Sequence, residues 1–295
     1  MDLMAAFPRE KRIKGILFDN PSMVLVLVAS YMAFVLKLGP DYMRHRKPYN
    51  LRPITRVYNL FQMLANVSFC YQAVELAWRY RYSKAFEFPC VPPTTEIPDL
   101  EGPGDTEQLI FFSVAYFYVR VLDLLDTVFF VLAKKFSHIS FLHVYHHVMV
   151  VTSAYVFLRS GWGNVIYYVS ILNSMVHIVM YFYYFLSTFP SMKPHLFWKR
   201  YLTVMQLIQF FIVGVHMTIV AIYNCGIPTI VVQYNISQAI IFIAMFTRFY
   251  LRNYANSSSD NAGCVSNVKQ PSLACGTRTV HVNNDIWEAD RVKDE

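Results

Sequence analysis

Charged residues are scarce in this chain. Only 15% of its 295 residues are Asp, Glu, Lys or Arg, and 55% are hydrophobic and 17% aromatic. Soluble domains carry about 25% charged residues, so this composition argues against a large soluble domain and indicates a chain that meets lipid. The net charge is +7, but the basic residues lie in short segments between apolar runs. That placement is typical of membrane proteins and argues against nucleic acid as a partner.

The chain also lacks a C-x-x-C cysteine pair and a cleavable signal sequence before its first apolar run. The five cysteines include no C-x-x-C pair, so we expect no structural zinc site. The short charged segment before the first apolar run has no cleavable signal pattern, which indicates that this run is a retained membrane span.

Long apolar runs dominate the rest of the chain. Seven are long enough, or nearly so, to cross a bilayer: residues 23–38, 58–78, 109–133, 141–158, 165–186, 201–223 and 229–251. The second is interrupted by polar residues, namely Asn59, Gln62, Asn66, Gln72 and Glu75. Lipid tolerates only helices and closed barrels, and these runs are too long and continuous for barrel strands. The sequence therefore predicts an all-α membrane protein, a seven-transmembrane helical bundle over residues 23–251.

The distribution of basic residues predicts how the bundle is oriented. The loops on one side of the predicted bundle carry eleven Lys and Arg residues and those on the other side carry four. The richer side is expected to be cytosolic, which places the segment 1–22 in the lumen and the tail 252–295 in the cytosol. Four basic residues in the N-terminal segment, from Arg9 to Lys14, oppose this orientation.

Sequence features on the predicted cytosolic and lumenal sides suggest a cellular compartment. The tail is polar and aperiodic, so we expect it to be disordered. Its last residues, Arg291-Val-Lys293-Asp-Glu295, resemble a dibasic retrieval signal of the endoplasmic reticulum. Cys90 and Cys225 both fall on the predicted lumenal side, where a disulfide is compatible with the compartment; two unpaired cysteines are the alternative.

Histidines gather on one face of the fourth predicted span. His143, His146 and His147 follow the i, i+3, i+4 spacing that puts side chains on one helix face. Ionisable groups inside a membrane are costly and indicate a functional site. Three imidazoles on one face are therefore interpreted as part of such a site and not as packing residues.

Charged residues occur in the third predicted span. Arg120, Asp123 and Thr127 share a face, and Asp126 lies beside it. A self-neutralising Arg120–Asp123 ion pair is the structural alternative for the first two. It leaves Asp126 unexplained, and a carboxylate next to an imidazole orients the ring.

The fifth and sixth spans add polar residues at a similar depth. Asn173, His177, Tyr181 and Tyr184 share one face of the fifth span, although tyrosines are also common at membrane interfaces. Gln206 and Gln209, with Thr203, follow helical spacing in the sixth, where polar residues also join helices. At about 1.5 Å per residue, His146, His177, Asp126 and Gln206 all lie roughly 8–14 Å from the predicted cytosolic ends of their spans. Four helices thus bring polar groups to one layer.

These four segments together resemble the ELO family of very-long-chain fatty acid elongases of the endoplasmic reticulum. The third-span segment from Arg120 to Thr127 is similar to the family's K-x-x-E-x-x-D-T, with Arg120 in place of Lys and Asp123 in place of Glu. The three others match H-x-x-H-H, H-x-x-M-Y-x-Y-Y and T-x-x-Q-x-x-Q, beginning at residues 143, 177 and 203. The resemblance runs from about residue 20 to residue 255.

The resemblance implies a reaction. A long-chain acyl-CoA condenses with malonyl-CoA, and CO2 and CoA leave a 3-oxoacyl-CoA two carbons longer. His146 would attack the thioester to form an acyl-imidazole, and His177 would act as partner base or second covalent position. Asn173, His147 and Gln209 are candidate oxyanion donors, and Asp126 would orient a histidine. The implied partners are the two CoA substrates, the bilayer and other elongation-cycle enzymes; a homodimer is permitted but not required, and no bound cofactor or metal is expected.

Basic residues at the predicted cytosolic mouth could meet CoA phosphates. Those considered are Lys134, Lys135, Lys193, Lys199 and Arg200. The positive-inside rule alone accounts for basic residues at this side of a membrane, so the phosphate-binding role is a hypothesis.

Two other functions fit parts of the pattern. Membrane di-iron desaturases and hydroxylases also use H-x-x-H-H, but they need about eight histidines in several boxes, and this chain has nine histidines with only one box. A seven-span receptor or transporter fits the number of spans. A receptor does not need a face of three histidines, whereas a proton-coupled transporter could use one.

Overall fold

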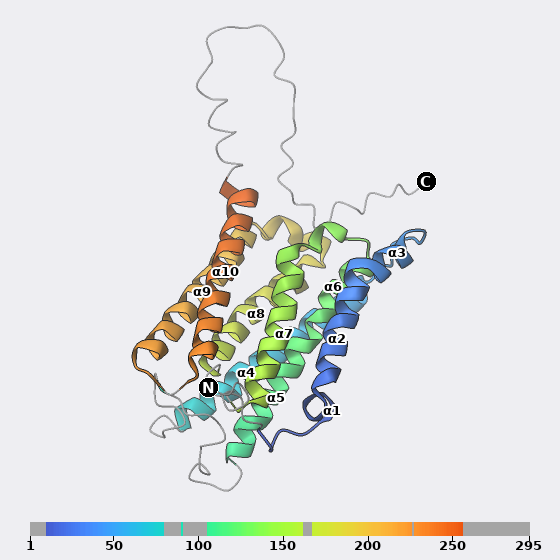
Figure 1. Cartoon of the computed structure of the whole chain (residues 1–295). Coiled ribbons are helices and arrows are strands. Elements are labelled where there is room, and N and C mark those ends of the chain that lie inside the picture. Colours follow the sequence, from blue (N-terminus) through green and yellow to red (C-terminus); the bar gives the residue numbers. More distant parts are fainter. Residues whose placement is uncertain (1–9, 80–89, 91–104, 162–166, 226, 256–295) are drawn as a thin grey trace, which may run out of the picture.

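The structure is a computed structural model that describes residues 10–79, 90, 105–161, 167–225 and 227–255. Within these ranges every regular element is a helix, and the long helices run side by side as a bundle (Figure 1). The predicted helical class is therefore confirmed.

The first span is longer than predicted. It begins after a short helix, α1 (Ile16–Asp19), and joins α2 (Pro21–Ala33), η1 (Phe34–Leu38) and α3 (Gly39–Met43) into one span, Pro21–Met43. The expected end at residue 38 was wrong, because the π-helical turn η1 continues the helix through Gly39 and Pro40 into α3. A Cβ at Gly39 would lie 2.6 Å from Val131, so glycine permits the close contact with α6.

The second and third predicted spans are helical but differ from the expectation. The second corresponds to α4 (Arg52–Arg79), and the third is two helices, α5 (Asp105–Leu122) and α6 (Leu124–Leu132), separated at Asp123. Among the described residues, five helices are long and apolar enough to cross a membrane: Pro21–Met43, Phe141–Arg159, Tyr167–Ser187, Lys199–Ile222 and Thr229–Tyr254. The protein is thus a multi-pass membrane protein, and seven crossings stay a prediction.

The remaining helices follow the predicted spans closely. They are α7 (Phe141–Arg159), α8 (Tyr167–Ser187), α9 (Lys199–Ile222) and α10 (Thr229–Tyr250), with the short helices η4 (Phe136–His138) and η6 (Pro190–His195) between them. Ser140 starts α7 by accepting a hydrogen bond from the His143 N–H. The last helix continues as η7 (Leu251–Ala255), beyond the predicted end at 251. Residues 1–9 of the predicted lumenal segment and 256–295 of the predicted tail lie outside the described residues.

Six helices close into a ring. Contacts connect α4 to α5, α5 to α7, α7 to α10, α10 to α9, α9 to α8 and α8 back to α4, while the first span packs outside on α6 and α7. Large apolar side chains point outward, among them Leu25, Val57 and Phe197 at 68%, 71% and 79% exposure. Lipid accommodates such apolar side chains on the outside, and polar groups are expected to face the bundle interior. The ring therefore defines where a polar site can lie.

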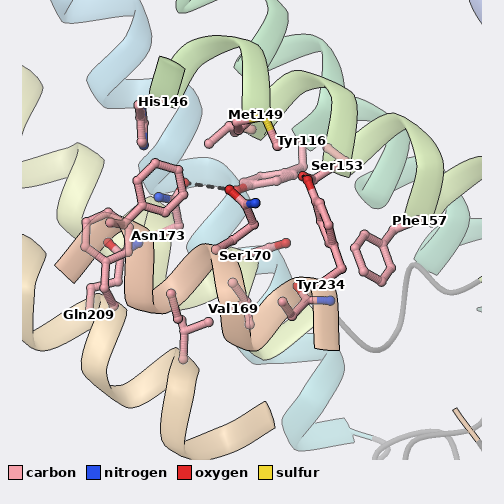
Figure 2. A pocket seen from close by; sticks show the side chains of 18 residues that line it. Tyr116, His146, Met149, Ser153, Phe157, Val169, Ser170, Asn173, Gln209 and Tyr234 are labelled. Atoms are coloured by element: carbon pink, nitrogen blue, oxygen red, sulfur yellow. Dashed lines mark hydrogen bonds between the residues drawn. The ribbon is translucent and has the colours of Figure 1, made fainter. Parts of the chain in front are cut away.

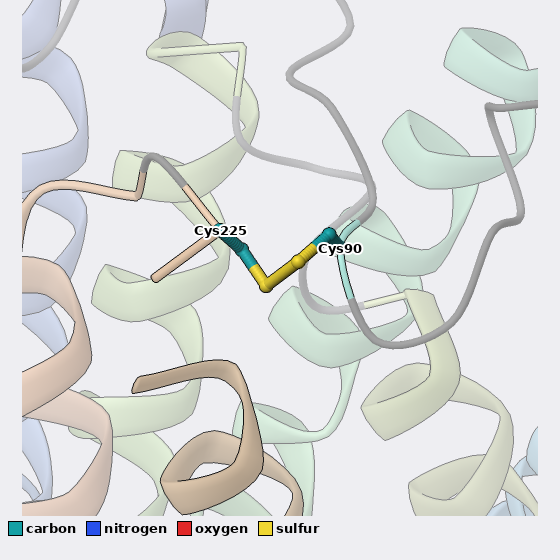
Figure 3. The surroundings of a disulfide bond; sticks show 2 residues. All are labelled: Cys90 and Cys225. Atoms are coloured by element: carbon teal, nitrogen blue, oxygen red, sulfur yellow. A yellow bond between two sulfur atoms is a disulfide. The ribbon is translucent and has the colours of Figure 1, made fainter. Parts of the chain in front are cut away.

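A disulfide joins two segments that lie outside the helices. Cys90, between α4 and α5, is bonded to Cys225, which follows α9 (Figure 3). At the C-terminal end of α7, the Glu10 N–H donates to the Arg159 carbonyl at 2.8 Å. The start of the described chain is thus tied to the end of α7.

Candidate active site

A fully buried arginine organises the centre of the ring. Arg120, on the last turn of α5, donates from one guanidinium nitrogen to Asn173 Oδ1 at 3.1 Å and from the other to Asn66 Oδ1 at 2.5 Å. The first nitrogen also lies 2.6 Å from His177 Nδ1 and 3.1 Å from the Asp123 carboxylate. Since a guanidinium has only donors, His177 Nδ1 accepts and the proton of the neutral ring lies on Nε2.

The proposed Arg120–Asp123 pair is therefore present, but it is part of a larger network. The Asp123 carboxylate also accepts from Gln62 Nε2 at 2.7 Å and from Tyr181 OH at 2.8 Å. A buried charge pair of this kind is stabilised when further hydrogen bonds use its remaining capacity; here Arg120 Nε alone of the guanidinium nitrogens has no partner among the described residues. Arg120 and Asp123 thus balance each other's charge and hold His177 and Asn173 in place.

The sequence reasoning missed the contribution of α4. Gln62 and Asn66 were interpreted only as interruptions of an apolar span, yet both are buried and contact the charged pair. Tyr58, one turn earlier, accepts from Gln62 Nε2 at 3.1 Å. Tyr58, Gln62 and Asn66 follow i, i+4, i+8 spacing, which places them on one helix face, and this pattern in the sequence could have identified them.

Asp126 has a different neighbour from the one expected. Its carboxyl group contacts the Tyr181 hydroxyl at 2.8 Å and contacts no imidazole among the described residues. The carboxylate that lies near an imidazole is Asp123, 3.6 Å from His177 Nδ1. The Tyr181 hydroxyl has one proton, which the two carboxyl groups share. Tyr181 therefore connects Asp123 and Asp126 in one hydrogen-bond network.

The three histidines of α7 form a contiguous row. His143 Nε2 lies 2.9 Å from the Thr127 hydroxyl, which also meets Tyr31 OH at 2.8 Å. The His143 and His147 ring centroids are 4.4 Å apart, and those of His147 and His146 are 5.5 Å apart. The predicted common face is thus observed, and its anchor is the Thr127 hydroxyl on α6.

A cavity opens next to this row, and His146 points into it (Figure 2). Asn173 and Gln209 line the same cavity, as does Tyr116, whose hydroxyl donates to Asn173 Oδ1 at 2.9 Å. With Arg120 also donating to that oxygen, the Asn173 amide nitrogen is left to serve the cavity. The other lining residues are Met149, Val150, Ser153, Ala154, Phe157, Val169, Ser170, Phe210, Val213, Tyr234, Asn235, Gln238, Ala239 and Phe242.

Two predicted residues, Gln206 and Tyr184, belong neither to the cavity lining nor to the hydrogen-bond network around Arg120 in the described part of the chain. Gln206 Nε2 approaches the Met180 sulfur at 3.9 Å. The Tyr184 ring packs edge-on against Tyr181 with centroids 6.0 Å apart. Both lie near the polar network without a direct hydrogen bond to its charged pair among the described residues.

Of the basic residues at the predicted cytosolic mouth, only some lie near one another. Lys135 lies between α6 and α7, and burial together with the positive charges of Arg52 and Lys193 lowers its pKa to about 8. Lys134 reaches the Arg44 carbonyl at 3.4 Å instead. Lys199 is half-buried at the start of α9, and the exposed Arg200 donates to the Tyr201 hydroxyl at 2.9 Å. Lys135 is therefore grouped with Arg52 and Lys193.

No group of three or more His, Cys, Asp or Glu suited to a metal ion occurs in the part of the chain that the structure describes. His177 Nδ1 faces the Arg120 guanidinium at 2.6 Å. Imidazoles can in general take part in acid–base or nucleophilic chemistry.

Comparison with known proteins identifies the family. The family model described as ELO: GNS1/SUR4 family matches residues 16–262. The chain belongs to the ELO family. Very long chain fatty acid elongase F of Drosophila melanogaster is 36% identical over 247 residues, which cover 83% of this chain and 93% of that protein.

Vertebrate relatives agree with this assignment. Very long chain fatty acid elongase 5 is 33% identical in Rattus norvegicus and 34% in Homo sapiens, in each case over 249 residues, 84% of this chain and 79% of the relative. The resemblance predicted from the four motifs is confirmed. Membership in the ELO family makes the chain an enzyme of fatty acid elongation.

Proposed function

We propose that this protein condenses a long-chain acyl-CoA with malonyl-CoA, and that His146 carries the acyl group between the two half-reactions. The supporting observation is the position of His146, which enters a largely apolar cavity together with the amide side chains of Asn173 and Gln209. It is the only imidazole among the residues that line this cavity as the structure describes it.

In the first half-reaction a neutral His146 nitrogen attacks the thioester carbonyl carbon. The C–S bond breaks, the proton on the other ring nitrogen passes to the CoA thiolate, and an acyl-imidazole remains. In the second, the C–C bond to the malonyl carboxylate breaks and releases CO2, and the resulting enolate attacks the acyl carbon. The C–N bond then breaks and the ring takes up one proton, so His146 is regenerated and one proton is consumed overall.

Asn173 is proposed as the principal donor to the oxyanion that forms in each half-reaction. Tyr116 and Arg120 hold its oxygen, which directs its N–H groups away from them and toward the cavity. A donor fixed in this way needs no reorganisation as charge develops, and removal of one such donor costs roughly 10²–10³-fold in rate. Gln209 lines the same cavity and is the second candidate.

His177 is proposed to position and to donate, and not to form a second covalent bond. Its Nδ1 lone pair faces Arg120 at 2.6 Å, so attack by that nitrogen would require loss of this contact. Its Nε2 carries the proton. His143 and His147 hold the ring of His146 through the row of contacts that starts at Thr127.

The mouth and the orientation complete the proposal. Lys134, Lys135, Lys199 and Arg200 would meet the phosphates of CoA in the cytosol, with Lys135 contributing most because its neighbours Arg52 and Lys193 enlarge the positive field. The Cys90–Cys225 bond supports a lumenal location for the opposite end, since disulfides persist in that compartment. The membrane is then that of the endoplasmic reticulum, with the N-terminus lumenal and the C-terminus cytosolic.

Intact mass spectrometry tests the covalent step. Detergent-purified protein is incubated with a long-chain acyl-CoA alone, and a mass gain equal to the acyl group is expected in the wild type and not in His146→Ala. The matched control is His216→Ala, a histidine of α9 that packs on Tyr168 and does not line the cavity. Malonyl-CoA should discharge the adduct.

The other outcomes separate the parts of the proposal. Product formed from both substrates without any adduct would refute the acyl-imidazole and leave the condensation. Neither adduct nor product would refute both and would call for iron analysis of the purified protein.

A further inference from the structure

The cavity has polar side chains well beyond the proposed reaction centre. On the walls formed by α7 and α10, Ser153, Tyr234, Asn235 and Gln238 line it together with apolar residues. A saturated hydrocarbon chain offers nothing to such groups, and an unpaired polar group in an apolar environment is unfavourable. We therefore expect these side chains to influence which acyl chains the cavity accepts.

Several of these groups keep hydrogen-bond donors to spare. The Ser153 and Tyr234 hydroxyls meet at 2.6 Å, and this one bond uses one of their two protons. Gln238 Oε1 accepts from Tyr145 OH at 2.8 Å, and its Nε2 has no partner among the described residues. At least one O–H and one amide N–H₂ thus stay available next to the space that the acyl chain would fill.

Their depth corresponds to the middle of a long chain. Ser153 is seven residues beyond His146 on α7, or about 10 Å at the rise of a helix, and Phe157 is roughly 16 Å away on the same estimate. Figure 2 shows Ser153 of α7 meeting Tyr234 of α10, with Phe157 beyond them and His146 at the other end. The donors therefore lie between the reactive carbonyl and the far end of the cavity.

We propose that the cavity selects cis-unsaturated acyl chains whose double bond lies in mid-chain, between the level of Gln238 and that of Ser153 and Tyr234, which is one helical turn further from His146. This inference rests on the proposed condensation and names its substrate class. The π electrons of the double bond accept the spare O–H and N–H donors, which a saturated segment leaves unpaired. Differential pairing of this kind appears in kcat/KM for competing substrates.

Elongation kinetics with 18-carbon acyl-CoAs test the proposal. Purified protein is given labelled malonyl-CoA with a saturated chain, a chain with one central cis double bond, or a chain with a central hydroxyl group. The wild type should favour the cis chain over the saturated one by roughly fivefold, the factor that corresponds to about 1 kcal/mol. Ser153→Ala combined with Tyr234→Phe should reduce that ratio to within about twofold.

Two further variants guard against effects on folding. Thr152→Val removes a neighbouring hydroxyl that bonds only the α7 backbone, at 2.7 Å to the Val148 carbonyl, and should keep the wild-type ratio. Gln238→Leu removes the amide donors independently and should lower the ratio in the same direction as the double variant.

Each result bears on the proposal. An unchanged ratio in both Ser153→Ala/Tyr234→Phe and Gln238→Leu, or a wild-type preference for the saturated chain, would overturn it. A preference for the hydroxylated chain would overturn the substrate class. If the wild type extends no acyl-CoA, the proposed condensation fails instead; the selection is then measured as the rise in Tm that each acyl-CoA produces, and equal rises would overturn it as well.

Discussion

Exchange of Arg120 and Asp123 for the Lys and Glu of the family motif tests whether these side chains act as a length-matched pair. Arg120 reaches Asn66, Asn173, His177 and the Asp123 carboxylate through two nitrogens. Lysine has one nitrogen on a differently shaped stem, so Arg120→Lys loses at least one contact. A hydrogen bond to a charged group contributes about 1.5–3 kcal/mol. Asp123→Glu adds a methylene group to a packed interior, which costs about 1–3 kcal/mol.

The double variant should cost less than the sum of the single ones. A shorter cation and a longer anion restore the distance between the charges, and coupling between contacting residues is about 0.5–3 kcal/mol. We expect each single variant to lower the free energy of unfolding by about 2 kcal/mol, and the double variant by no more than either single one.

Thermal unfolding in detergent and turnover of acyl-CoA with malonyl-CoA are measured for all four proteins. The control is Glu75→Asp with Arg79→Lys, an exposed i, i+4 pair whose cycle should stay within about 0.5 kcal/mol. If the loss of unfolding free energy in the Arg120→Lys/Asp123→Glu variant equals the sum of the two single losses, the two side chains do not act as a length-matched pair.

Three further predictions follow from single features. Lys135, with its pKa lowered to about 8, is charged below that pH and neutral above it, so KM for acyl-CoA should rise above pH 8, and Lys135→Arg should remove the rise. Loss of the Cys90–Cys225 bond, which joins residues 135 apart, should lower the free energy of unfolding by about 2–5 kcal/mol; an unchanged Tm after Cys90→Ser would contradict this. Tyr181→Phe deprives Asp123 and Asp126 of a shared donor and should cost about 1–3 kcal/mol, whereas Tyr184→Phe, measured by the same unfolding assay, should be nearly neutral.

Helical periodicity predicted the parts of the site that lie on single helices. The common face of His143, His146 and His147 follows from spacing alone, and so does the alignment of Asn173 with His177. These predictions needed only 3.6 residues per turn and the cost of ionisable groups in lipid.

Contacts between helices could not be read in the same way. Asp126 was expected to orient a histidine, because a carboxylate next to an imidazole fixes the orientation of the ring, yet it contacts Tyr181. Gln62 and Asn66 weakened the hydropathy of α4, and the same polarity is what satisfies the buried charges of Arg120 and Asp123. Periodicity gives the face on which a side chain lies, but the partner depends on the rotation and depth of the neighbouring helix.

The site divides into a charged network and a cavity without formal charge, and Asn173 belongs to both. Its oxygen accepts from Arg120 and Tyr116, while its amide group lines the cavity that His146 enters. Arg120 and Asp123 therefore need not touch the substrate to influence the reaction, because their mutual neutralisation fixes the direction of the Asn173 dipole. A charged group in the cavity itself would attract water. A negative charge there would favour the protonated form of His146, which is not nucleophilic. In the proposed mechanism, confining the charge to the network behind Asn173 keeps His146 in a setting where its neutral ring can attack a thioester.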